Sequence, residues 1–327
     1  MMKGLIVTCF VVLITFFGTS SKEKSFKIVL LPDTQHYSES YPEIFYAQAQ
    51  WIAENPDSIA FVLHQGDITN HNTSKEWEVA SGAMSLLDGK VPYVVCIGNH
   101  DYGTNGANDI RNTEPFNTWF PYEKYSKTAG FGGAFEEGKM DNVWYTFKAG
   151  GINWLILSLE FGPRNKILDW ASEVVKNHPS HKVIINTHAY MYSDDTRMSE
   201  ERGHHWLPML SKMNIGATGS EAVNNGEQMW KKFVSQYPNI LMVVSGHVLD
   251  DGVGTLVSEG KHGNKVYQML ANYQKYVNGS VNGGNGFFRI LTVNPGKRRI
   301  SVRTYSPYLN EYITDPSQQF EFEGVLF

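Results

Sequence analysis

Five hydrophobic, strand-like runs in this sequence each end in side chains that can bind a metal ion. In α/β sheets, ligands bind in the crevice beyond the carboxyl ends of the strands. An isolated aspartate or histidine after a strand is usually structural, but five such strand ends in one chain predict a shared metal site. The runs and the residues that follow them are Phe26–Leu31 with Asp33 to His36, Ile59–His64 with Gly66 and Asp67, Tyr93–Ile97 with Gly98 to Asp101, Lys182–Thr187 with His188, and Ile240–Ser245 with Gly246 and His247.

The rest of the chain predicts a mixed-sheet α/β protein. Early strands are separated by helical patterns, which indicates crossover connections, whereas the later strands follow one another with little helix between them. No glycine-rich phosphate loop of a nucleotide-binding fold is present. The further expected strands are Trp144–Phe147, Asn153–Leu159, Val266–Leu270, Phe287–Val293 and Ile300–Tyr305. The expected helices are Pro42–Glu54, Ser74–Asp88, Ile167–Asn177 and Glu227–Gln236.

From Phe26 to Val248 the order of the motifs resembles that of the calcineurin-like metallophosphoesterase superfamily. The pattern of that family is Asp-x-His, Gly-Asp, Gly-Asn-His-Asp/Glu, a single His and Gly-His-x-His. The most specific match is the segment from Gly98 to Asp101. The resemblance implies an α/β fold in which a sandwich of two mixed β-sheets is flanked by helices, with a two-metal site at the strand ends.

One of the two metal positions is complete. By position in the motifs, the resemblance implies that Asp67 bridges two ions and that Asn99, His188 and His247 complete one site with it. One carboxylate, one amide oxygen and two imidazoles suit a borderline transition metal such as Zn, Mn or Fe.

The other position lacks two of the family's ligands, because Gln35 replaces a histidine of the first motif and Leu249 replaces one of the last. In an extended segment, His36 would face away from Asp33 and Gln35 and could not substitute. Asp33, Gln35, Asp67 and water would form an oxygen-rich site, which favours Mg, Mn or Ca and weaker binding. We therefore expect two unequal metal sites.

The resemblance also implies a mechanism. A metal-activated hydroxide would attack phosphorus in line with the leaving oxygen, and His100 would assist the leaving group. In several relatives an aspartate holds this histidine from the place that Asn70 occupies here. Asn70 could hold His100 or be a plain loop residue. Asp101 is the alternative partner of His100, or it could only stabilise the turn after its strand.

Three functions remain open from the sequence. We expect hydrolysis of phosphoester bonds, with phosphodiesters slightly favoured because no arginine cluster is evident for clamping a phosphate dianion. A secreted phosphomonoesterase or nucleotidase is the first alternative. Gln35 and Leu249 also allow a different class, a catalytically weak, metal-bound ligand-binding protein.

The N-terminus predicts export to the periplasm or the extracellular space. Lys3 precedes an apolar run over Leu5–Phe17, which is short for a membrane span and is typical of a signal-peptide core. We expect residues 1–20 to be a signal peptide, or else an N-terminal anchor, and residues 25–327 to form one metallophosphoesterase domain.

Composition narrows the partners. The net charge of −5 lacks the positive field of a dedicated nucleic-acid binder. We therefore expect a small-molecule or glycan-linked phosphoester substrate, no clear nucleic-acid binding, and no membrane contact beyond the leader.

Four further side chains are expected to be structural or solvent-exposed. Cys96 should be a buried, inert thiol, and His64 a core residue with satisfied hydrogen bonds. His204 and His205 should be exposed loop residues.

Overall fold

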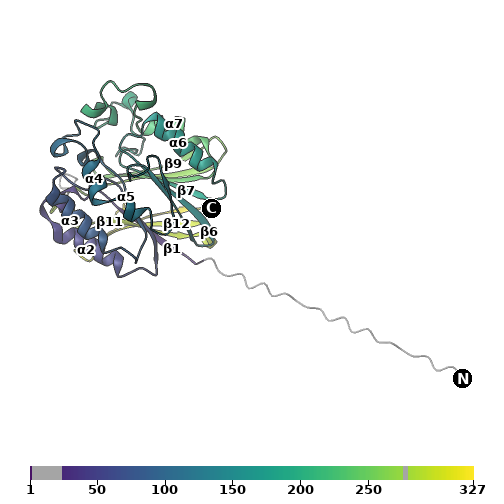
Figure 1. Cartoon of the computed structure of the whole chain (residues 1–327). Helices are drawn as coiled ribbons and strands as arrows, with labels where there is room; N and C mark the ends of the chain where they lie inside the picture. Colours follow the sequence, from purple (N-terminus) through teal and green to yellow (C-terminus); the bar gives the residue numbers. More distant parts are fainter. Residues whose placement is uncertain (2–23, 275–278) are drawn as a thin grey trace.

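The computed structural model describes residue 1 and residues 24–274 and 279–327 (Figure 1). The expected leader lies outside the described residues. Among the described residues, no helix is long and apolar enough to cross a membrane.

Two seven-stranded mixed sheets form the centre of the fold, as expected. The first sheet contains, in spatial order, β13 (Glu311–Ile313), β12 (Arg299–Ser306), β11 (Phe288–Asn294), β1 (Phe26–Leu31), β2 (Ile59–His64) and β3 (Tyr93–Val95), and β14 (Phe320–Glu323) pairs with β12. The second sheet contains β4 (Phe131–Ala134), β5 (Val143–Ala149), β6 (Ile152–Leu159), β7 (Lys182–Thr187), β8 (Ile240–Ser245), β10 (Lys265–Ala271) and β9 (Val253–Glu259).

The strands that lead to the predicted motifs lie in the parallel part of each sheet. Strands β1, β2 and β3 run parallel, as do β6, β7, β8 and β10. Parallel neighbours place their carboxyl ends at the same edge of a sheet. All five motifs therefore emerge at one end of the sandwich, three from the first sheet and two from the second.

The helices cover the outer faces of the sandwich. In Figure 1, α2 and α3 lie together beside the first sheet, and α6 and α7 lie near the second. Helix α6 buries an apolar face of Ile167, Leu168, Ala171, Val174 and Val175, which is the 3.6-residue spacing of a helix on a sheet. The helix bounds are α1 (Gln35–Ser40), α2 (Pro42–Ala53), α3 (Ser74–Ser85), α4 (Glu114–Trp119), α5 (Tyr122–Tyr125), α6 (Asn165–Lys176) and α7 (Gly226–Lys232).

The ten expected strands and four expected helices are present, with shifted ends at several of them. Four strands were missed. Strand β4 contains two glycines, and β9, β13 and β14 are short or mostly solvent-facing strands that pair with a single neighbour. Such strands lack the apolar pattern that marks a buried strand.

Candidate metal centre

Glycines allow the metal-binding motifs to approach one another closely. Gly66 has φ +97°, and a Cβ atom there would overlap His188 and the backbone of Gly98. A Cβ atom on Gly98 would overlap Asp67, and one on Gly246 would overlap Asp33. The glycines of these motifs are thus required by the contact between loops, which explains their place before Asp67, Asn99 and His247.

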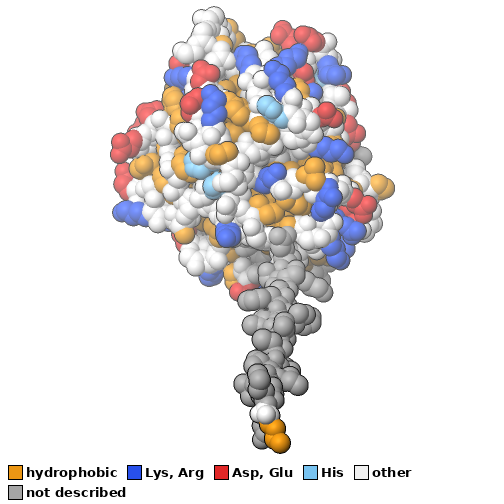
Figure 2. Space-filling model, turned by 90° about the vertical axis from the view of Figure 1, so that its right-hand side faces the viewer, with side chains coloured by type: hydrophobic (Ala, Val, Ile, Leu, Met, Phe, Trp, Pro, Cys, Tyr) orange, Lys and Arg blue, Asp and Glu red, His pale blue; other side chains and the backbone are white. Residues whose placement is uncertain are grey.

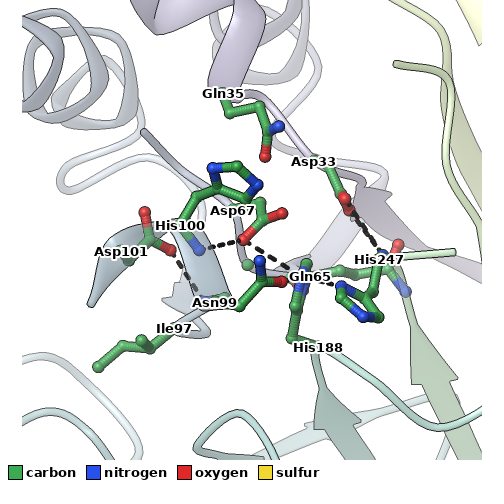
Figure 3. Close-up of polar contacts among 12 residues, drawn as sticks. Asp33, Gln35, Gln65, Asp67, Ile97, Asn99, His100, Asp101, His188 and His247 are labelled. Carbon is green, nitrogen blue, oxygen red and sulfur yellow. Dashed lines mark hydrogen bonds and ion pairs between the residues drawn. The ribbon is translucent and has the colours of Figure 1, made fainter. Parts of the chain in front are cut away.

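Four donor atoms of the predicted complete site converge (Figure 3). His188 Nε2 lies 3.1 Å from Asn99 Oδ1, 3.2 Å from Asp67 Oδ1 and 3.1 Å from His247 Nδ1. Ligands about 2.1 Å from one ion in a tetrahedral site are ~3.4 Å apart, so these spacings of 3.1–3.2 Å are close to those around a single cation. Asp67, His188 and His247 form a buried cluster that could hold a metal ion.

The hydrogen bonds on the far side of each imidazole fix which nitrogen carries the proton. His188 Nδ1 lies 2.8 Å from the carbonyl oxygen of Gln65, and His247 Nε2 lies 2.8 Å from that of Trp206. A carbonyl only accepts, so both of these nitrogens must carry hydrogen. In the neutral rings, His188 Nε2 and His247 Nδ1 then direct lone pairs toward the same point as Asp67 and Asn99. This is the arrangement by which outer hydrogen bonds orient metal-binding histidines.

Neighbouring charges in the centre shift the pKa values of its side chains. Burial alone would lower the pKa of His188, but the carboxylates of Asp67 and Asp33 outweigh it and raise that pKa to about 9. Burial and the neighbouring His188 lower the pKa of His247 to about 3. Burial and the Asp67 carboxylate raise the pKa of Asp33 to about 7. A cation at these donors would take the place of the His188 proton, so metal binding and protonation compete here.

The oxygen-rich position expected from the sequence would lie beside Asp33. Its carboxylate accepts hydrogen bonds from the backbone N–H of His247 and from the side-chain amides of Asn272 and Gln274. Gln35 lies above it, and its side-chain oxygen is buried without a hydrogen-bond partner. An unpaired buried carbonyl oxygen is uncommon and fits the donor set of a hard cation.

His36 contributes no ligand to this position, but the geometric reason given from the sequence was wrong. The segment is not extended, because helix α1 begins at Gln35. The His36 ring contacts Glu39 one helical turn later, with Nδ1 3.4 Å from Oε2.

His100 lies beside Asp67, and its backbone N–H donates to Asp67 Oδ1 over 2.9 Å. His100 Nδ1 lies 2.9 Å from the backbone carbonyl of Asn70, which therefore holds the ring through its main chain. The side chain of Asn70 instead bonds to Gln35 and Glu39. Burial lowers the pKa of His100, but the Asp67 charge and the Asn70 carbonyl outweigh it, and the net pKa is raised.

Asp101 is a loop anchor in the structure. Its buried carboxylate accepts from the backbone N–H groups of Ile68, Thr69 and Gly98 and from the Thr69 hydroxyl. Among the described hydrogen bonds, none joins the Asp101 carboxylate to the His100 ring. Of the two roles considered for Asp101, the geometry favours stabilisation of the turn.

The remaining side chains singled out in the sequence are structural. Both ring nitrogens of buried His64 have hydrogen-bond partners, as expected of a core residue. Cys96 is buried, as expected, and burial raises the pKa of its thiol. The expectation for His204 was wrong. It is buried, because its ring stacks on Tyr192 with centroids 3.9 Å apart.

Comparison with known proteins identifies the family. A model of the calcineurin-like phosphoesterase family matches residues 26–251. The chain belongs to that family. An uncharacterized protein of Bacillus subtilis (strain 168), YvnB, is 30% identical over 306 residues, which are 89% of this chain and 21% of that protein.

Two further similarities involve purple acid phosphatases. A probable inactive purple acid phosphatase 9 of Arabidopsis thaliana is 25% identical over 51% of this chain and 30% of that protein. The purple acid phosphatase PPD1 from yellow lupin seeds has a similar fold, with a TM-score of 0.56 at 12% identity over 92% of this chain and 54% of that chain. This chain therefore spans a fifth to a third of the length of its two curated relatives.

Three residues near the metal centre were not found from the sequence. Asn272 and Gln274 follow strand β10, so the rule that polar residues after parallel strands gather at one edge could have found them. Trp206 contacts His247 only through its carbonyl oxygen, which any residue carries, so no sequence signal marks it.

Proposed function

We propose that this chain hydrolyses phosphoester bonds in a metal-dependent reaction and favours phosphodiesters. The observation that carries the proposal is the convergence of Asp67, Asn99, His188 and His247, with both imidazole tautomers fixed toward one point. We assign Zn, Mn or Fe to this position and Mg, Mn or Ca to the weaker one beside Asp33. A bound divalent cation would polarise a phosphoryl oxygen and lower the pKa of water.

His100 is the proposed proton donor to the leaving oxygen. Its Nδ1 carries the hydrogen that bonds to Asn70, so Nε2 is the nitrogen left for substrate. The raised pKa of His100 favours the protonated ring that this role requires. Asp101 keeps the loop of His100 in place.

The preference for diesters is supported by charge. Among the described hydrogen-bond partners of the metal-centre residues there is no lysine or arginine. A doubly charged monoester is usually held by such cations, whereas a singly charged diester needs fewer of them. The face in Figure 2 carries positive and negative side chains side by side, without the broad positive patch expected of a nucleic-acid binder. We propose a small-molecule or glycan-linked phosphoester as the substrate. Export to the periplasm or the extracellular space, with a cleaved or anchoring leader, completes the proposal.

Two aryl esters test the proposal. We expect the metal-loaded protein to hydrolyse bis(p-nitrophenyl) phosphate with a higher kcat/KM than p-nitrophenyl phosphate, and chelation to abolish both reactions. A higher kcat/KM for the monoester would favour the phosphomonoesterase or nucleotidase. Binding of either ester without turnover, across a panel of divalent metals, would favour the ligand-binding protein.

A further inference from the structure

The oxygen-rich position is oriented by a side chain outside the residues that match the family. We propose that Gln274 is a positioning residue that directs the side-chain oxygen of Gln35 and the carboxylate of Asp33 toward one hard cation beside Asp67. The inference rests on the proposed metal dependence. It adds the residue that orients the ligands of the second ion.

The orientation of Gln274 follows from the charge of Asp33. The Gln274 side-chain NH₂ group donates to Asp33 Oδ2. In the ionised form that a cation requires, the Asp33 carboxylate only accepts, so the amide cannot be turned with its oxygen facing Asp33. Gln274 Oε1 must therefore face away from Asp33, and it lies 3.1 Å from Gln35 Nε2.

A second carboxylate orients the amide of Asn70 in the same way. Asn70 Nδ2 donates to Glu39 Oε2 over 3.0 Å, which turns Asn70 Oδ1 away from Glu39. Asn70 Oδ1 lies 3.4 Å from Gln35 Nε2. Asp33 and Glu39 thus fix two separate amides, and each presents its oxygen to the same nitrogen of Gln35.

Gln35 has no freedom left in this arrangement. Both hydrogens of its NH₂ group have acceptors, so turning the amide over would bring its oxygen against two other oxygens. Gln35 Oε1 is consequently left buried and without a hydrogen-bond partner. Figure 3 shows this oxygen directed toward the side of the centre where Asp67 and Asp33 lie.

The carboxylates supply the other oxygens. Asp33 Oδ2 receives the amides of Asn272 and Gln274, whereas Asp33 Oδ1 shares only the backbone N–H of His247. Asp67 Oδ1 belongs to the complete site, and Asp67 Oδ2 takes part in none of the described hydrogen bonds. The available ligands are therefore Asp33 Oδ1, Asp67 Oδ2 and Gln35 Oε1, all of them oxygens. Such a set favours Mg²⁺, Mn²⁺ or Ca²⁺ over softer ions.

Metal binding tests the inference without any measurement of turnover. The full chain is stripped of metal, loaded with one equivalent of Zn²⁺, and titrated with Mn²⁺ by calorimetry and electron paramagnetic resonance. We expect the Zn²⁺-loaded wild type to bind one Mn²⁺ as its second ion, more weakly than it binds Zn²⁺. Gln274→Met should lower the affinity for that Mn²⁺ by roughly 10–100-fold, as is usual when a residue that orients a metal ligand is lost, while the Zn²⁺ stays bound. Gln35→Met should abolish the second ion, and Gln35→His should shift the preference of this position from Mn²⁺ toward Zn²⁺.

Gln48→Met is a matched control. Gln48 is a buried glutamine on α2 that also has an unpartnered side-chain oxygen, but its NH₂ group bonds to the carbonyl of Phe287. We expect this variant to bind both ions as the wild type does.

Two results would overturn the inference: a wild type that binds no second ion, or a Gln274→Met variant that keeps its Zn²⁺ and binds the second ion as tightly as the wild type. Retained Zn²⁺ shows that a variant is folded. If Gln274→Met does not fold, Gln274→Asn takes its place, because its shorter side chain keeps the amide but cannot span from Asp33 to Gln35. Absence of ester hydrolysis together with these binding results would refute the proposed function alone. Hydrolysis without a second ion would refute this inference alone.

Discussion

Replacing Asp101 separates an anchoring role from a chemical one. Its fully buried carboxylate joins the loop after β2, which carries Asp67, to the loop after β3, which carries Asn99 and His100. Asp101 Oδ1 accepts from Ile68 N at 3.0 Å, and from Thr69 N and Thr69 Oγ1 at 2.9 Å each. The other oxygen, Oδ2, accepts from Gly98 N at 2.8 Å.

The size of the effect follows from these donors. In Asp101→Asn one oxygen becomes an NH₂ group, so either Gly98 N–H or the two donors of Thr69 lose their acceptor, whereas Ile68 N–H lies within reach of both oxygens. A buried donor left unpaired costs about 1–3 kcal/mol, and we expect Asp101→Asn to lose about 2 kcal/mol of unfolding free energy. Asp101→Ala removes the acceptors of all four donors and should cost about 4 kcal/mol or more.

Urea unfolding of the metal-loaded protein measures the loss of unfolding free energy. Metal analysis, together with kcat and KM on a diester, shows how that loss affects metal binding and turnover. We expect both variants to bind metal more weakly, because Asp67 and Asn99 lie on the loosened loops. Asp109→Asn is the matched control, since the Asp109 carboxylate accepts from the backbone N–H of Thr104 in an exposed loop, away from the metal centre. An Asp101→Asn variant with wild-type stability and metal affinity, but with one limb of the pH–kcat profile missing, would refute the anchoring role.

Three further predictions concern catalysis, acid stability and metal. His100→Ala should lower turnover by roughly 10²–10⁴-fold and leave the metal content, measured by mass spectrometry, unchanged; wild-type turnover on a diester would remove His100 from the mechanism. Burial opposes ionisation of Glu160, but Arg164 and Arg111 outweigh it and lower its pKa. The stabilisation from ionised Glu160 is therefore present above the ordinary pKa of 4.5 and is lost as the pH falls through the lowered pKa. Glu160→Gln should be less stable than the wild type near pH 7, and its unfolding free energy in urea should fall less steeply toward pH 3. The same pH dependence of the unfolding free energy in both proteins would contradict this prediction. Chelation should lower Tm and added Zn²⁺ should restore it, since an ion at 1,000 times its Kd stabilises the folded protein by about 4 kcal/mol. A Tm that changes neither on chelation nor on addition of Zn²⁺ would argue against a filled site.

Local sequence was sufficient for much of the fold. Runs such as Ile59–His64 and Lys182–Thr187 were found with the ends that the structure shows, because buried parallel strands are continuously apolar. Strand β3 is shorter than expected and ends at Val95. Cys96 N still bonds to the His64 carbonyl of β2, but the chain then turns into the Gly98 loop and leaves the sheet.

The family motifs also identified the side chains of the complete site before their positions were known. His188 comes directly after β7 and Asp67 three residues after the end of β2, a strand of the other sheet, and the sequence indicates only that each follows a strand. The tautomers of His188 and His247 could not be predicted, because the carbonyl groups of Gln65 and Trp206 that fix them have no signature in sequence.

Sequence alone therefore determined the buried strands, the ligand types and the two departures at Gln35 and Leu249, since these depend on residue identity and short-range pattern. Tertiary structure decided what Gln35 does. Its amide is fixed by Asn70 and by Gln274, which is 239 residues away along the chain. Hydrogen bonds of that range depend on how the two sheets pack together, and no local pattern in the chain encodes them.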